Sequence, residues 1–332
     1  MNLYFPPFIY SFFLFSGTLI SISSSSLFGM WMGLEINLMS FIPMIINLEN
    51  NKKSSEAAIK YFLIQAMASA MVIFMALYFY LFSGYVFSQT PNLLITLALC
   101  MKLGMAPFHF WFPEVLEGLS WVNSLLLLTW QKISPLVILS IFFFNKALIT
   151  MALISAIVGA ISGINQTSMR KILAFSSISH LGWISSLMYF NSSLWISYFY
   201  IYCFTSFILC FSFWMLNLNF FSQLMLNQNI NEKFIIFINL LSLGGLPPLL
   251  GFLPKWISIM VMSNNFPILI ILISSSLITL YFYTRLCFST FTLYTQSMNW
   301  FSKNKTSKNF YIMSLFTLLS MFGIIPLSIF SI

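Results

Sequence analysis

Residues Asn92 to Gly118 read NLLITLALCMKLGMAPFHFWFPEVLEG, an apolar run that Gly104, Pro107 and Pro113 interrupt. A bilayer core about 30 Å thick requires roughly twenty apolar residues per helix, so this run is longer than one crossing needs. Glycine and proline inside such a run interrupt the backbone hydrogen bonds of a helix. The stretch therefore predicts a membrane helix that is broken part of the way across.

A second long run, residues 234–263, is interrupted in the same way. Its Leu243-Gly244-Gly245-Leu246-Pro247 shares the pattern L-G-x-x-P with Leu103-Gly104-Met105-Ala106-Pro107, and each pattern is followed by another proline, Pro113 or Pro254. Paired broken helices in the two halves of a chain are typical of transporters built from repeats.

The composition around these runs belongs to a membrane protein. Hydrophobic residues make up 60% of the 332 residues and charged residues 6%, whereas a soluble domain is about 25% charged. The net charge of +8 comes from single basic residues between apolar runs, which form no stripe for nucleic acid. Polar breaks delimit eleven predicted spans: 3–23, 26–48, 57–82, 92–118, 121–143, 147–167, 172–190, 194–219, 234–263, 266–289 and 310–331.

The basic residues fix the sidedness of these spans, because lysine and arginine collect in loops on one side of a membrane. The loop after span five holds Lys146, and the loops after even-numbered spans hold Lys52, Lys53, Arg170, Lys171, Lys233, Lys303, Lys305 and Lys308. We therefore place the N-terminus on the basic side and the C-terminus opposite. The broken spans are the fourth and the ninth, and an odd offset inverts the second unit relative to the first.

The predicted fold is thus an all-α polytopic membrane protein of about 11 transmembrane helices, with two inverted five-helix repeats and a C-terminal helix. We expect one transmembrane domain, 1–332, in which residues 1–145 and 146–290 form the repeats and residues 291–332 form a loop and the last helix. The first apolar run follows no basic segment and precedes no cleavage site, so we expect a retained helix and no import signal.

Charged residues inside the spans are the candidate functional residues, because a charge near the bilayer centre costs about 2.5 to 3.5 kcal/mol on insertion scales. Four of them are predicted near mid-depth: Glu35, Lys102, Lys132 and Lys255. His180, in the span that corresponds to that of Glu35, is a further candidate, so we expect parallel sets of ionisable groups in the two halves. Alternatives stay open, since a lysine can snorkel, a glutamate can serve a structural ion pair and a histidine can fill a buried hydrogen bond.

Other polar residues are interpreted as structural. Glu56 and Lys60 are four residues apart, which favours a surface ion pair. Glu114 and Glu117 leave span four and are most simply solvated, and His109 lies close to a helix end. The four cysteines, Cys100, Cys203, Cys210 and Cys287, show neither a C-x-x-C pair nor metal-ligand spacing, so we expect no metal site.

The four buried charges suggest a proton relay. A lysine carries protons near neutral pH only where its surroundings lower its pKa from about 10.4, and a nearby carboxylate opposes that change. If Glu35 approached Lys102 to about 4 Å, the attraction at an effective dielectric of 20 would be roughly 4 kcal/mol. Moving the carboxylate would then switch the lysine between holding and releasing a proton, which Lys132 could pass through water and His180 toward Lys255.

The residues that carry this hypothesis also carry a resemblance: Met30 to Asn37, Lys102 to Pro113, Trp130-Gln131-Lys132, Asn165-Gln166-Thr167 with Arg170-Lys171, Ser176 to Trp183, and Gly244 to Trp256. Along essentially its whole length the chain resembles the antiporter-like membrane-arm subunits of NADH:ubiquinone oxidoreductase, respiratory complex I, in the shortened animal form. The resemblance implies a helix-two glutamate at Glu35 and lysines at Lys102, Lys132 and Lys255.

The resemblance also implies an activity and a place. It implies proton translocation across the mitochondrial inner membrane, with the N-terminus in the matrix, the C-terminus in the intermembrane space, and other membrane-arm subunits and the lipid bilayer as partners. No G-x-G-x-x-G pattern or cysteine cluster is present, so we expect NADH, FMN, iron-sulfur clusters and ubiquinone to be bound by other subunits. Two alternatives remain at this point: a free-standing cation/proton antiporter, and a scaffold subunit whose buried charges only fix helix packing.

Overall fold

The chain is all-helical in the computed structural model, which describes residues 7–47, 52–81, 89–142, 145–190, 193–226, 230–292 and 308–322. Over these residues the β pairing is limited to one isolated bridge, between Ser168 and Phe220. The helices are α1 (Pro7–Ser23), α2 (Leu27–Asn47), α3 (Lys52–Leu81), α4 (Gln89–Leu103), α5 (Trp111–Gly118), α6 (Trp121–Leu128), α7 (Trp130–Phe142), α8 (Asn145–Gly163), α9 (Met169–Phe190), α10 (Leu194–Met215), α11 (Phe221–Leu226), α12 (Ile230–Gly244), α13 (Phe252–Val261), α14 (Phe266–Thr292) and α15 (Lys308–Phe322).

Within the described ranges, seven helical segments are long and apolar enough to cross a membrane. Shorter apolar helices cover Phe8–Ser23, Asn92–Leu103 and Phe252–Val261. Large apolar side chains such as Phe74 and Leu277 are about 60% exposed, which suits a surface that faces lipid. The prediction of a polytopic membrane protein is therefore confirmed, and the count of eleven spans stays a prediction.

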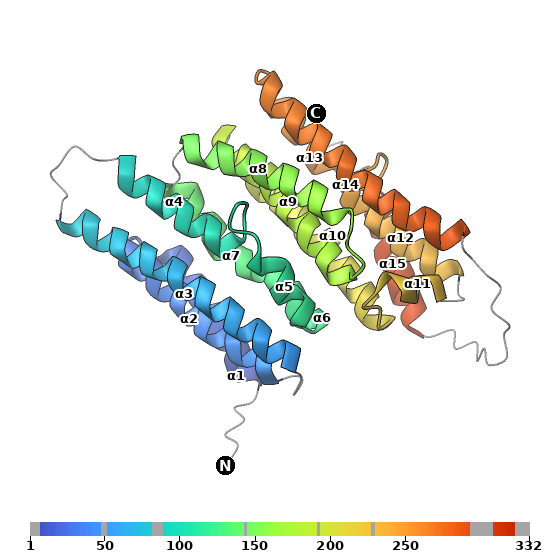
Figure 1. Cartoon of the computed structure of the whole chain (residues 1–332), viewed down its shortest axis with the longest axis horizontal. Helices are drawn as coiled ribbons and strands as arrows, with labels where there is room; N and C mark the ends of the chain where they lie inside the picture. Colours follow the sequence, from blue (N-terminus) through green and yellow to red (C-terminus); the bar gives the residue numbers. More distant parts are fainter. Residues whose placement is uncertain are drawn as a thin grey trace, which may run out of the picture. The chain divides into compact units, whose positions relative to one another are not determined.

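The helices form two compact units, residues 1–155 and 156–332. In the first unit α1, α2 and α3 lie side by side, and α3 and α4 carry the packing on to α5 and α7 (Figure 1). In the second unit α9 contacts α10, α13 and α14, while α12 packs on α10, α14 and α15. These compact units are not the predicted repeats, and the repeat boundary after residue 145 stays a prediction.

Both long runs are broken in the structure, and both breaks have the same backbone geometry. After α4, Gly104 has φ +71° and donates to Met101 O, and Met105 donates to Cys100 O. After α12, Gly245 has φ +81° and donates to Ser242 O, and Leu246 donates to Leu241 O. This is the Schellman C-cap, whose left-handed residue is usually glycine.

The two breaks correspond in a register that differs by one residue from the L-G-x-x-P match. That match pairs Gly104 with Gly244, whereas the equivalent left-handed residue is Gly245. With Gly104 paired to Gly245, the offset is 141 residues. The same offset relates both ends of α4 to the ends of α12, and the start of α5 to the start of α13. The following prolines, Pro113 and Pro254, obey the same offset.

The predicted span 121–143 contains an interruption that the sequence analysis did not include. α6 ends at Leu128 and α7 begins at Trp130, and Thr129 between them has φ −116° and ψ −71°. The Thr129 hydroxyl donates to Leu125 O at 2.8 Å, and Lys132 N bonds back three residues to Thr129 O. Pro135 has no N–H for the carbonyl of Gln131, so this part of the helix cannot complete its regular bonding.

The geometry of the first break predicts the effect of a substitution at Gly104. Gly104→Ala places a side chain in the left-handed region, with its Cβ 3.0 Å from Cβ of Phe112. We expect the free energy of unfolding to fall by about 1 to 2 kcal/mol, measured on the purified chain in detergent.

Gly104→Asn is the matched control, because asparagine enters the left-handed region more readily than alanine. It should lose less stability than Gly104→Ala although its side chain is larger. An equal or greater loss in the asparagine variant would assign the cost to the contact with Phe112 instead of the backbone.

Candidate functional site

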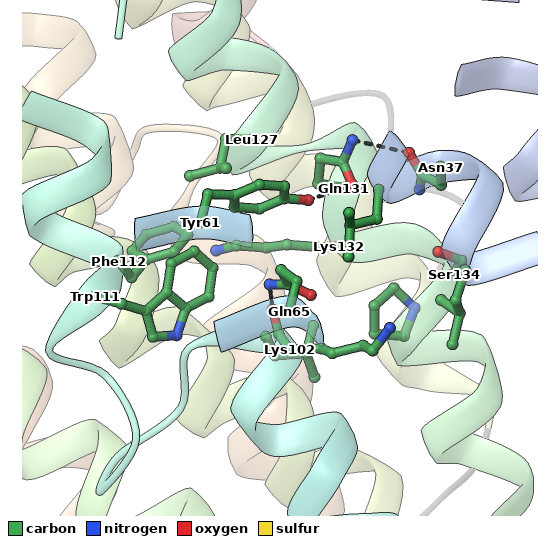
Figure 2. A pocket seen from close by; sticks show the side chains of 14 residues that line it. Asn37, Tyr61, Gln65, Lys102, Trp111, Phe112, Leu127, Gln131, Lys132 and Ser134 are labelled. Carbon is green, nitrogen blue, oxygen red and sulfur yellow. Dashed lines mark hydrogen bonds between the residues drawn. The ribbon is translucent and has the colours of Figure 1, made fainter. Parts of the chain in front are cut away.

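A cavity in the first unit brings two of the predicted lysines together. Lys102 in the last turn of α4 is 6% exposed, and Lys132 in the first turn of α7 is 2% exposed. Both line a cavity of about 20 Å³, which is large enough for about one water molecule. Figure 2 shows their amines pointing away from each other, which would keep the two positive charges apart when both are protonated.

Side chains from two other helices complete the end of α4 beside this cavity. The last carbonyls of a helix have no partner within it and carry partial negative charge. Gln65 of α3 donates through Nε2 to Lys102 O at 3.1 Å, and Trp111 of α5 donates through Nε1 to Met101 O at 3.2 Å. These contacts let α4 end inside the membrane, and they leave Lys102 at the negative end of the helix.

A neutral hydrogen-bond chain forms another wall of the cavity. Gln131 of α7 donates through Nε2 to Asn37 Oδ1 of α2 at 2.9 Å, and the Tyr61 hydroxyl of α3 donates to Gln131 Oε1 at 3.2 Å (Figure 2). Gln131 directly precedes Lys132 in sequence, so its two partners fix the start of α7 to α2 and α3. Three helices are therefore held in register at the cavity.

These amides and Tyr61 were not among the residues predicted to have a role. A signal was present, because an amide inside an apolar span costs free energy unless it is hydrogen-bonded. Asn37, Gln65 and Gln131 all interrupt apolar helices in this way. Their partners, in contrast, lie on other helices and follow only from the fold.

Lys132 and Glu35 occupy different positions relative to the cavity. Lys132 Nζ lies 5.0 Å from the centroid of the Phe112 ring, within the range of a cation–π interaction. Glu35 is half-buried on α2 and lies outside the cavity lining, and its carboxylate interacts electrostatically with Lys102. In this conformation the described residues show no Glu35–Lys102 ion pair within 4.0 Å, so the close approach considered above is absent here.

The second unit places Lys255 across the second break. Lys255 on α13 is 6% exposed, and its Nζ donates to Gly244 O, the last residue of α12, at 2.7 Å. A Cβ at Gly245 would come within 2.9 Å of Lys255 Cδ, so the glycine also leaves space for the lysine side chain. The ammonium group therefore satisfies a helix-terminal carbonyl that accepts no hydrogen bond from a backbone N–H of the described residues.

His180 lies on α9 in the same unit and is 9% exposed. Its Nδ1 is 2.9 Å from the Tyr198 hydroxyl of α10, and its ring centroid is 5.2 Å from that of Tyr202. α9 packs against α13, the helix that carries Lys255. The step from Lys132 to His180 joins residues of different units and stays a prediction.

The expected partner of Lys60 was wrong, whereas Glu114 is exposed to solvent as expected. Lys60 pairs with Glu114 at 2.7 Å instead of with Glu56, because folding brings α5 against α3. Glu114 is therefore paired as well as exposed, and such exposed pairs contribute little stability.

The buried charges of the two halves do not match position by position. At the offset of 141 residues that relates the two breaks, Lys255 corresponds to Glu114, and Lys102 corresponds to Leu243.

His109 lies in the segment between α4 and α5. It is 8% exposed, its Nδ1 is 3.2 Å from Pro107 O, and its ring centroid lies 4.3 Å from that of Phe110 in a tilted arrangement. These local contacts agree with a structural role. In the described part of the chain, no three His, Cys, Asp or Glu side chains gather as metal ligands do.

Comparisons with known proteins agree with this architecture. The family described as "NADH:quinone oxidoreductase/Mrp antiporter, TM" matches residues 24–281. NADH-ubiquinone oxidoreductase chain 2 of Anopheles gambiae is 45% identical over 96% of both chains, and that of Locusta migratoria is 41% identical over 94% of this chain and 93% of the relative. The mouse chain 2 is 43% identical over 90% of this chain and 88% of the relative.

Solved structures share the fold at low sequence identity. A chain of respiratory complex I from Thermus thermophilus superposes with a TM-score of 0.78 at 20% identity, covering 96% of this chain and 78% of that one. A chain of the Mrp complex from Dietzia sp. gives a TM-score of 0.79 at 13% identity, covering 94% and 73%. With the family match and the chain 2 relatives, these findings show that the chain belongs to the NADH:quinone oxidoreductase/Mrp antiporter transmembrane family, in the group of NADH-ubiquinone oxidoreductase chain 2.

Proposed function

We propose that this chain moves protons across the mitochondrial inner membrane as a core membrane-arm subunit of NADH:ubiquinone oxidoreductase. The observation that carries the proposal is the convergence of Lys102 and Lys132 on one small cavity beside a broken helix. Intramembrane lysines are costly to insert and mark ion and proton paths. The chain 2 relatives supply the complex in which such a path would work.

The proposal includes a division of labour within that complex. NADH, FMN, iron-sulfur clusters and ubiquinone are bound by other subunits, and this chain belongs to a translocase without carrying out redox chemistry. Each elementary charge moved against the membrane potential costs about 2.3 kcal/mol per 100 mV. Electron transfer to ubiquinone elsewhere in the complex supplies that free energy, and the partners of this chain include neighbouring antiporter-like membrane-arm subunits.

The topology behind this function is also part of the proposal. It comprises eleven transmembrane helices, inverted repeats at 1–145 and 146–290, a C-terminal segment at 291–332 and a matrix N-terminus. The matching Schellman caps at Gly104 and Gly245, and the constant offset between α4 and α12, support the repeats. The concentration of basic residues in alternate loops supports the sidedness.

In the first unit we assign the proton transfer to Lys102 and Lys132. Two ammonium groups in one cavity repel, so protonation of one disfavours protonation of the other. For the transfer the two amines, which point away from each other in Figure 2, turn toward one water in the cavity. The Lys102 ammonium then gives a proton to that water, and the water gives a proton to the neutral Lys132 amine, so charge moves and mass balances. Glu35 sets the direction, because its carboxylate favours the charged form of Lys102 more strongly when it is near than when it is far.

In the second unit Lys255 receives the charge and His180 is the intermediate carrier. Lys255 holds its proton in a charge-assisted bond to Gly244 O, which is stronger than a bond from a neutral amine. His180 has two ring nitrogens, one of which faces Tyr198, and can accept and donate protons between them. The packing of α9 on α13 supports this assignment.

The central test removes the charge of Lys132 and keeps its size. With Lys132→Met, we expect normal assembly of the complex and coupled turnover lowered at least about tenfold, because a positioned proton carrier contributes two or more decades of rate. The measurement is the number of protons translocated per NADH oxidised in sealed membranes, with the assembled amount determined in parallel.

Lys60→Met is the matched control, since it removes an exposed lysine of the same unit. Unchanged pumping in both variants would make the buried lysines structural, as in a scaffold subunit. Sodium-driven proton exchange by the chain alone in proteoliposomes would favour a free-standing antiporter instead.

The hydrogen bond between Asn37 and Gln131 generates a separate prediction about stability. Each single variant, Asn37→Leu or Gln131→Leu, leaves a buried partner unsatisfied and should lower the free energy of unfolding by about 1 to 3 kcal/mol. The double variant should lose less than the sum, with a coupling free energy of about 1 kcal/mol. Denaturant titration of the purified chain measures this cycle.

Asn123→Leu provides the reference for that cycle, because Asn123 bonds to Met44 O and not to Asn37. When Asn123→Leu is combined with Asn37→Leu, the loss in the free energy of unfolding should equal the sum of the two single losses to within about 0.5 kcal/mol. Additivity of the Asn37 and Gln131 variants would show that their contact does not hold α2 to α7.

A further inference from the structure

A second cavity lies in the second unit, and no residue of the proposed relay lines it. Its volume is about 300 Å³, and residues 163–167, helix α11 and the last turns of α14 line it. Neither His180 nor Lys255 is among its lining residues. It includes Asn165, Gln166 and Thr167, a polar segment that the proton path does not use.

The position of this cavity corresponds to the boundary between apolar and polar layers of a membrane. The apolar span of α8 ends at Gly163, and that of α9 begins at Met169. The apolar span of α14 ends at Phe288, within one turn of Arg285. Three spans thus end around the cavity, so its ligand would lie at the depth of lipid headgroups.

The polar wall of the cavity is suited to an anion. Arg285 donates through Nη1 to Ile164 O at 3.4 Å, which places its guanidinium beside residues 163–167. Guanidinium is a planar fork of donors that matches phosphate geometry, and side-chain amides and hydroxyls add hydrogen bonds. Arg285 is the charged member of the lining, which contains no Asp or Glu among the residues the structure describes.

The cavity also has apolar lining residues, and the adjoining face of α14 is apolar. Phe221 and Phe282 line the cavity. Outside it, Leu277, Tyr281 and Phe288 are 60%, 58% and 70% exposed, and their spacing places them on the same face of α14 as Arg285. From Arg285 to Leu277 this face extends about 12 Å along the apolar span.

A phospholipid joins a phosphate headgroup to apolar acyl chains, which matches an anion-binding cavity beside an apolar helix face. We propose that this cavity binds the phosphate headgroup of an anionic membrane phospholipid, with an acyl chain along the Leu277–Phe288 face of α14. The charge of Arg285 selects the anionic headgroup, and the exposed apolar side chains bind the acyl chain. A free phosphate ion would use only the first of these contacts.

The test uses the assembled complex in nanodiscs that contain phosphatidylglycerol with a photoactivatable acyl chain. After illumination, mass spectrometry of peptides locates the adducts. In the native chain we expect adducts on residues 277–288 of α14. Arg285→Gln should lower this labelling at least about tenfold, since a hydrogen-bonded charge pair is lost, and Arg285→Lys should fall between the two because it keeps the charge without the fork.

Lys171→Gln is the matched control, because it removes a basic residue near the start of α9 that does not line the cavity. Its labelling should equal that of the native chain. Absence of adducts on α14 in the native complex would overturn the proposal without any variant. It would equally be overturned by unchanged labelling in Arg285→Gln, by equal labelling with photoactivatable phosphatidylcholine, or by complete competition with inorganic phosphate.

Discussion

The constraint on which this fold depends is that a helix ending inside a bilayer must have its terminal carbonyls satisfied by protein groups, because lipid offers no donors. Both broken helices meet it with specific side chains. Gln65 and Trp111 bond the end of α4, and Lys255 bonds the end of α12. The backbone contributes a Schellman cap at each break, which in turn requires a residue with positive φ. The breaks are therefore well-defined structures held by their neighbours.

The same constraint explains how lysines are accommodated. The carbonyl end of a helix is a negative pole, so a cation is least costly there. Lys102 lies in the last turn of α4, and Lys255 reaches back to the last residue of α12. Breaking a helix thus creates a place where a proton-carrying amine can reside within the membrane. In this chain, the proposed proton path and the fold depend on the same backbone feature.

The sequence was sufficient to predict the features that neighbouring residues determine. Glycine and proline within long apolar runs indicated both breaks, and isolated charges indicated Lys102, Lys132 and Lys255. It was insufficient where a partner lies far along the chain. The bond from Gln65 to Lys102 O and the pairing of Lys60 with Glu114 both join segments that only the packing of α3 with α4 and α5 brings together. The one-residue error in the match of the breaks arose because Gly244 and Gly245 are adjacent, and only the backbone angle distinguishes them.

Helix α9 has a further consequence, which concerns biogenesis. It is the least apolar of the seven candidate spans, and 94% of its apolar window is buried. Its serines, including Ser176, Ser177 and Ser179, donate their hydroxyls to carbonyls three residues earlier in the same helix. A serine that is satisfied within its own helix places little demand on the surroundings. These serines therefore add little to the cost of inserting α9 into lipid before its neighbours have assembled, whereas His180 obtains its hydrogen-bond partner, Tyr198, only when α10 packs against α9.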